Sequence, residues 1–116
     1  MDLASQSDAD IMAVVDPIMN HLMDASTAVD YAAHVRDFTE RAKGMLSRPA
    51  FEAICSQYQN TRGLFAARER VAIFRRPDSI AVVWRQCFTK VPGDYVAELV
   101  LVEREGRNLV DHVMVF

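Results

Sequence analysis

The spacing of apolar residues changes at Gly63, and this change constrains the fold more than any other feature of the chain. In residues 8–62 apolar side chains recur every three or four positions, which is the period of an amphipathic helix. In residues 64–116 they recur at every second position, which is typical of strands. Helices followed by antiparallel strands predict an α+β domain, in which a helical layer covers one face of a sheet. A chain of 116 residues has room for a single domain, spanning residues 1–116.

Composition and charge argue against several classes of protein. The formal net charge is -3, whereas a nucleic-acid-binding domain needs a basic surface to neutralise phosphates. No apolar run approaches the roughly 18 residues of a membrane span, and the acidic N-terminus lacks the charge pattern of a signal peptide. No Cys/His cluster or glycine-rich phosphate loop is present. We therefore expect a cytoplasmic protein with no metal, no cofactor, and no nucleic-acid or membrane partner.

Three helices are predicted in the first half of the chain. Asp8 is suited to cap the first one, and Pro17 either kinks a single long helix or starts a new one; we favour the single kinked helix. A second, short helix is expected over residues 27–41. Ser47 is placed to cap the third helix, and Gly63 to end it in the left-handed conformation.

Four antiparallel strands are predicted in the second half. The dipeptides Pro92-Gly93 and Glu105-Gly106 suit the tight turns of two-residue hairpin loops. With loops of that length, Leu99 lies opposite Gln86 on one neighbouring strand and opposite His112 on the other. The strands are expected over residues 64–75, 79–91, 94–104 and 107–116.

Both faces of this predicted sheet are apolar, whereas a sheet with one solvated face normally alternates apolar and polar residues. One face carries bulky side chains, among them Trp84 and Leu99, and we expect the helices to cover it. The other face is rich in valine with a small charged island, so we expect two such faces to meet in a homodimer. The alternative is that the charges form ordinary surface ion pairs. The residues expected on this dimer face are Val83, Arg85, Glu98, Val100, Asp111 and Val113.

A small-ligand pocket is predicted on the core face. Gln86 and His112 flank Leu99 there, and a few polar groups on an apolar concave face are typical of ligand pockets. Glu69 joins them in one register of the first hairpin, whereas a slip of one residue moves it to the other face. The alternative is that Gln86 and His112 are structural residues with internal hydrogen bonds. The pocket candidates are Gln86, His112, Glu69, Trp84 and Leu99, with Tyr31 near the mouth.

Four segments give the chain a resemblance to a known superfamily. They are Asp30-Tyr31-Ala32-Ala33-His34 ahead of Phe38, Leu46-Ser47, Gly63-Leu64-Phe65, and Glu105-Gly106-Arg107-Asn108-Leu109-Val110. In this pattern the chain resembles the cystatin-like/NTF2-like α+β superfamily, and most closely its small domains of unknown function. The resemblance implies a curved sheet wrapped around a long helix, frequent dimers, and in some members a pocket between them. We therefore predict a cystatin/NTF2-like α+β domain with three helices packed on a curved four-stranded antiparallel sheet.

The chain departs from the superfamily pattern in two places. Residues 36–48 are too short for the extra strands of its larger enzymes, and Asn108 stands where a tryptophan is frequent. The fold by itself does not imply a function. We expect a non-enzymatic module that forms a homodimer or binds a small apolar ligand. The alternative is a small isomerase, dehydratase or hydrolase that uses His112 as acid/base, with no metal.

Overall fold

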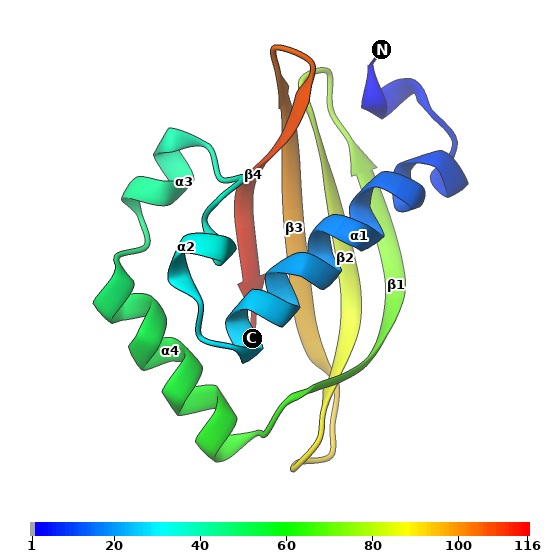
Figure 1. Ribbon diagram of the computed structural model, residues 1–116. Coiled ribbons are helices and arrows are strands. Elements are labelled where there is room, and N and C mark those ends of the chain that lie inside the picture. Colours follow the sequence, from blue (N-terminus) through cyan, green and yellow to red (C-terminus); the bar gives the residue numbers. More distant parts are fainter. Residues whose placement is uncertain (1) are drawn as a thin grey trace.

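The computed structural model describes residues 2–116, which form a helical layer and a four-stranded sheet (Figure 1). A short 3-10 helix, η1, begins the described chain, and four α-helices precede the strands, rather than the three helices predicted. None of these helices combines the length and the hydropathy of a membrane span. The elements are η1 (Leu3–Ser5), α1 (Asp8–Thr27), α2 (Tyr31–His34), α3 (Glu40–Gly44), α4 (Arg48–Thr61), β1 (Phe65–Arg75), β2 (Ser79–Phe88), β3 (Tyr95–Arg104) and β4 (Arg107–Val115).

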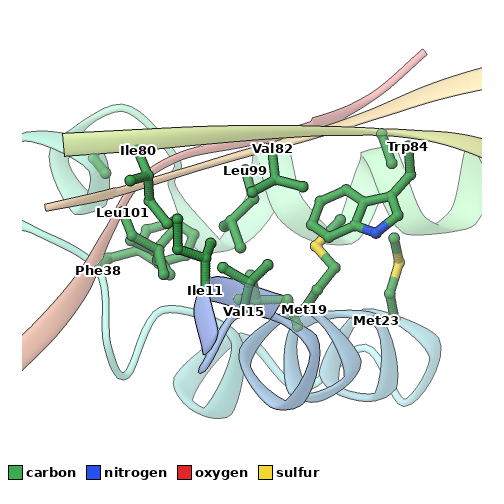
Figure 2. Close-up of a cluster of buried hydrophobic side chains, with 14 of the residues drawn as sticks. Ile11, Val15, Met19, Met23, Phe38, Ile80, Val82, Trp84, Leu99 and Leu101 are labelled. Carbon is green, nitrogen blue, oxygen red and sulfur yellow. The ribbon is translucent and has the colours of Figure 1, made fainter. Parts of the chain in front are cut away.

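The sheet is antiparallel throughout, with the strand order β1-β2-β3-β4, and α1 crosses one of its faces diagonally (Figure 1). Figure 2 shows the main core between them, where Val15 and Met19 of α1 point toward the strands. Val15, Met19 and Leu99 each have 0% of their surface exposed. Burial of apolar area at about 25 cal/mol per Å² drives this packing. The predicted α+β class is therefore confirmed.

The first helix is continuous from Asp8 to Thr27, with Pro17 inside it, as we favoured. Its cap differs from the prediction, because the Ser7 side chain accepts a hydrogen bond from the Asp10 N–H and Asp8 is already helical. Asp8 and Asp10 in the first turn complement the partial positive charge of the helix N-terminus.

The prediction of one helix over residues 27–41 is wrong, since this segment forms α2, an extended stretch and the start of α3. Phe38 makes a parallel bridge with Val110 of β4, and the Thr39 N–H donates to the Val110 carbonyl at 2.9 Å. The Thr39 side chain then caps α3. Because this stretch bonds to the sheet, its backbone cannot continue a helical ladder.

The last helix, α4, begins and ends as predicted. The Ser47 side chain caps it, and Gly63 follows its end with φ of +89°. A side chain at Gly63 would be strained in that conformation and would collide with the side chains of Thr89 and Lys90.

The hairpin between β2 and β3 is longer than predicted. The connection covers residues 89–94, and Leu99 pairs with Val82 instead of Gln86. The cause is a contact with an earlier segment. The N–H groups of Thr89 and Lys90 donate to the carbonyls of Leu64 and Arg62, so the chain leaves the ladder with β3 before it reaches the turn. The predicted partner of Leu99 differs from the observed one by four residues. Because four is an even number, each side chain of β2 and β3 keeps its predicted face.

Two bulges overturn predicted faces on the outer strands. In β1 the register shifts between Arg70 and Ala72, and Glu69 pairs with Arg85 on the face that no helix covers, called here the outer face. In β4 the register shifts at Asp111, so Leu99 pairs with Val113 rather than with His112. The tight turn at Glu105-Gly106 is confirmed, with Arg104 opposite Arg107. Since one extra residue reverses the alternation, His112 and Met114 lie on the outer face, and Val113 and Val115 face the core.

Candidate functional site

The polar residues predicted to form a pocket on the core face do not meet there. Gln86 is on that face and 1% exposed, and its amide nitrogen donates to the carbonyls of Ala66 and Cys87. His112 lies on the outer face, where its Nε2 is 2.8 Å from an oxygen of Glu98. Glu69 is also on the outer face, 3.8 Å from Arg85.

The apolar and aromatic members of the predicted pocket are packed against other residues. Trp84 and Leu99 belong to the main core, with 2% and 0% of their surface exposed. The Tyr31 hydroxyl donates to the Leu46 carbonyl at 2.6 Å, and its ring lies edge-on to Phe51. Of the six pocket candidates, only His112 lines the cavity between α4 and β4, and Trp84 borders a separate hollow beside Arg68 and Arg70.

Four of the six residues predicted for the valine-rich face lie on the outer face of the sheet, and two do not. Val83, Arg85, Glu98 and Val100 share the outer face of β2 and β3. Asp111 is the bulge residue of β4 and turns to the helical layer, where Thr39 and Arg41 bind its carboxylate. Val113 packs against the main core. The bulge is the physical reason for both corrections, because it shifts β4 by one residue.

A cavity of about 530 Å³ lies between α4 and β4, at the open side of the helical layer. We call it the α4–β4 groove. This volume falls within the range of about 300–1,000 Å³ that is usual for ligand sites. Its walls are mainly apolar, and its lining includes Phe38, Ile54, Phe88, Val113, Val115 and Phe116.

A small polar cluster forms part of the groove wall. The Ser26 hydroxyl lies 2.8 Å from the Tyr58 hydroxyl and 3.5 Å from the Cys55 sulfur. Burial raises the pKa of the Cys55 thiol, so the thiol is protonated at neutral pH and is a poor nucleophile. The cluster therefore offers hydrogen-bonding groups rather than a reactive thiolate.

His34 also lines the groove, although only 8% of its surface is exposed. Its Nδ1 lies 3.1 Å from the Leu22 carbonyl, which can only accept, so Nδ1 carries the proton. Burial lowers the pKa of His34 below its ordinary value of 6.5, which favours the neutral ring. Nε2 is then an acceptor, and it has no hydrogen-bond partner among residues 2–116.

Two arginines contribute the positive charge of the groove lining. Arg41 binds Asp111 at 3.0 Å, and hydrogen bonds from Arg41 and Thr39 hold the pKa of Asp111 below its ordinary value. Arg62 stacks its guanidinium over the rings of Phe88 and Tyr95 and has no carboxylate partner in the described chain. The lining thus leaves one cation uncompensated.

Sequence reasoning missed this groove. The Asp30 side chain caps α2, and this cap is the one local signal of the turn that places His34. No sequence feature within α4 or β4 predicts the space between these two elements. No group of three or more potential metal ligands occurs in residues 2–116.

Comparison with solved structures identifies the fold. A SEC-C motif containing protein from Rhodopseudomonas palustris matches with a TM-score of 0.61 and 11% identity, over 98% of this chain and 80% of that one. A cystatin-like fold protein of unknown function from Methylobium petroleophilum matches with a TM-score of 0.52 and 14% identity, over 90% and 75% of the two chains. The chain has the cystatin/NTF2-like fold.

A third similar structure is Bd1075 from Bdellovibrio bacteriovorus, with a TM-score of 0.54 and 8% identity. The match covers 95% of this cystatin-like domain but 42% of that protein. No family model and no curated protein matches the sequence. At these identities the similarity establishes the fold and leaves the function to be argued from the surfaces.

Proposed function

We propose that this cystatin-like domain is a non-enzymatic association module that forms a homodimer through its outer sheet face. The observation that carries the proposal is that the helices cover one face of the sheet (Figure 1), while the other face carries many apolar side chains. Phe74, Met114 and Phe116 on the outer face are 54%, 49% and 53% exposed. Val83, Val96, Val100 and Leu109 lie between them and are half-buried.

The charges on the outer face suit a two-fold contact. Arg85 lies 3.4 Å from Asp94, on one side of Val83 and Val100. Glu98 pairs with Val83 of β2 and with Met114 of β4, so it lies within the patch, where its carboxylate is 2.8 Å from Nε2 of His112. In a symmetric dimer each patch meets its own copy in reverse orientation, so Arg85 of one copy can pair with Glu98 of the other across the axis. Contact of the valines would remove the apolar centre from water.

We do not propose an enzyme that uses His112 as acid/base. That alternative rested on a core-face pocket around His112, and the bulge at Asp111 moves this side chain to the outer face. There its Nε2 is bonded to Glu98, and the residue is part of the surface proposed for association.

Substitution at the centre of the outer face tests the proposal. Val100→Glu introduces a charge into the proposed contact and is expected to convert a dimer to a monomer in size-exclusion chromatography with light scattering. Val29→Glu is the matched control, since Val29 is 38% exposed and lies between α1 and α2, away from the sheet. The control should keep the wild-type mass. An unchanged mass for Val100→Glu, or a monomeric wild type, would contradict the proposal.

A further inference from the structure

The edge of β4 that faces the α4–β4 groove carries backbone groups without partners. Val96 and Phe116 exchange both of their backbone hydrogen bonds, at 2.7 and 2.9 Å. Such pairs alternate along an antiparallel ladder, so the N–H and C=O groups of Val113 and Val115 point away from β3. β4 is the last strand of the sheet, and Figure 1 shows α4 on the side of β4 opposite to β3.

The other half of the same edge is already covered. The Val110 N–H donates to the Asp37 carbonyl at 2.8 Å, and the Val110 carbonyl accepts from Thr39 at 2.9 Å. Arg41 reaches the Asp111 carbonyl. In residues 2–116, no backbone group of another segment bonds to the free side of β4 at Val113 or Val115. The chain thus adds a short parallel pairing at Val110 and leaves the next part of the edge open.

Exposed apolar side chains surround this open edge. Met45 is 75% exposed and Ile54 is 53% exposed, and both line the groove from the helical side. Met114 and Phe116 line it from β4, with 49% and 53% of their surface exposed. Contiguous apolar surface of this kind commonly marks a binding site.

We propose that the α4–β4 groove binds an extended segment of another polypeptide, which pairs with Val113 and Val115 as a fifth strand. Alternate side chains of that segment would enter the cavity of about 530 Å³ and contact α4. Addition of a strand to an open edge is an established mode of peptide recognition, in which backbone bonds give affinity and pockets select side chains.

Two other occupants fit the groove less well. A small apolar molecule would fill the cavity but would cover the free N–H and C=O groups of Val113 and Val115 without bonding them, which is unfavourable. A second copy paired through β4 would place a whole sheet where α4 lies beyond the edge (Figure 1). A single extended strand can form hydrogen bonds with the free backbone groups of Val113 and Val115, and it fits in the space between β4 and α4.

Charge and hydrogen bonding narrow the chemistry of the segment. Arg62 has no carboxylate partner in the described chain and lines the groove, so an acidic side chain near it would complement the charge. Nε2 of His34 is an acceptor, which suits a hydroxyl side chain such as serine or threonine. The segment is therefore apolar in part, with an acidic residue and a hydroxyl group.

A synthetic peptide provides the direct test. The probe is a fluorescent peptide of about six residues that alternates valine and threonine and carries one glutamate. Fluorescence anisotropy should show saturable binding to the wild-type protein. The same peptide with alternate amides methylated keeps its side chains but cannot form the ladder, and it should not bind. Absence of binding by the first peptide, or equal binding of both, would overturn the proposal.

A pair of variants at Val115 tests the edge from the protein side. Val115→Pro removes an N–H that the fold does not use, which an edge strand tolerates, whereas Val115→Ala shortens the side chain and keeps the N–H. Once circular dichroism shows both variants folded, the proline variant should bind the peptide roughly three- to tenfold more weakly than the alanine variant.

The remaining outcomes identify the other occupants. Equal affinity of the two variants, or binding of dodecanoate with no binding of the peptide, would mean a small-molecule cavity and overturn the proposal. A lower oligomeric mass for Val115→Pro alone would mean that a second copy occupies the edge, which also overturns it. Met114 and Phe116 belong to both surfaces, but the two proposals are tested separately, because Val100→Glu alters the outer face and Val115→Pro alters the backbone edge of β4.

Discussion

Leu99 and Val100 are neighbours on β3, and their side chains point to opposite faces of the sheet. Leu99 has 0% of its surface exposed, because α1 and the short helices cover its face. Val100 stands among other apolar residues on the outer face, which no helix covers, and it stays half-buried. Apolar residues therefore occupy both faces, but the fold of one chain buries only one of them. This difference supports the proposal that the outer face associates with a second copy of the chain.

The largest expected difference between the faces is in the free energy of unfolding. Leu99→Ala should lower it by about 2–5 kcal/mol, since it opens a cavity in a closed core. Val100→Ala should lower the free energy of unfolding by less than Leu99→Ala does. Its effect should be larger at high protein concentration than at low, because dimerisation stabilises the folded chain by mass action. Urea unfolding of both variants at two protein concentrations measures this. Equal losses of unfolding free energy for Leu99→Ala and Val100→Ala, independent of protein concentration, would contradict the proposed difference between the two faces.

A second test sharpens the comparison within β4. Val113→Asn places an amide against the core and should lower the free energy of unfolding by about 1–3 kcal/mol. His112→Asn changes the outer face and should cost less than about 1 kcal/mol. Thermal unfolding of the two variants gives the order directly. The reverse order would mean that the bulge at Asp111 is absent and that His112 faces the core.

The smallest expected effect is the contribution of His34, in the helical layer, to the pH dependence of stability. Burial lowers the pKa of His34 below 6.5, so between that value and its lower folded pKa the unfolded chain binds more protons than the folded chain. Stability from this group is complete above about pH 6.5 and is lost as the pH falls through the window below it. His34→Gln should flatten this decrease in urea unfolding at pH 7.5 and 5.5. An unchanged pH dependence would show that His34 does not contribute.

Much of the fold could be predicted because its signals are local. The period of apolar residues identified the helical and strand halves, and the Ser47 cap and Gly63 marked the limits of the last helix. The faces of β2 and β3 survived a wrong loop length, because the error was even and the alternation has a period of two.

The rest depends on contacts between segments far apart in the chain. Thr39 and Arg41, about 70 residues earlier in the chain, bind the Asp111 carboxylate at the bulge. No sequence feature near Asp111 predicts this bulge. The same contacts divide the predicted second helix at Phe38. Since the candidate pocket was built on the register that this bulge changes, the site was misplaced, although the four antiparallel strands and their order were predicted correctly.

The groove was missed for a related reason. Its walls come from α4 and from the open edge of β4, and a sequence shows neither the gap between two elements nor which backbone groups stay unpaired. His34 is the nearest signal, but its burial follows from the turn after α1 and from Phe38 and Phe51 packing on its ring. The part of the outer face on β2 and β3 was predictable because the residues of these two strands alternate strictly between the faces, whereas the bulge in β4 moved Asp111 and Val113 off it.

The most direct test of the proposed homodimer is the mass of the wild-type protein by sedimentation equilibrium across a range of concentrations. The homodimer predicts twice the mass of one chain at high concentration, with dissociation on dilution. The mass of a single chain at every concentration would contradict it and leave the outer face without its proposed partner.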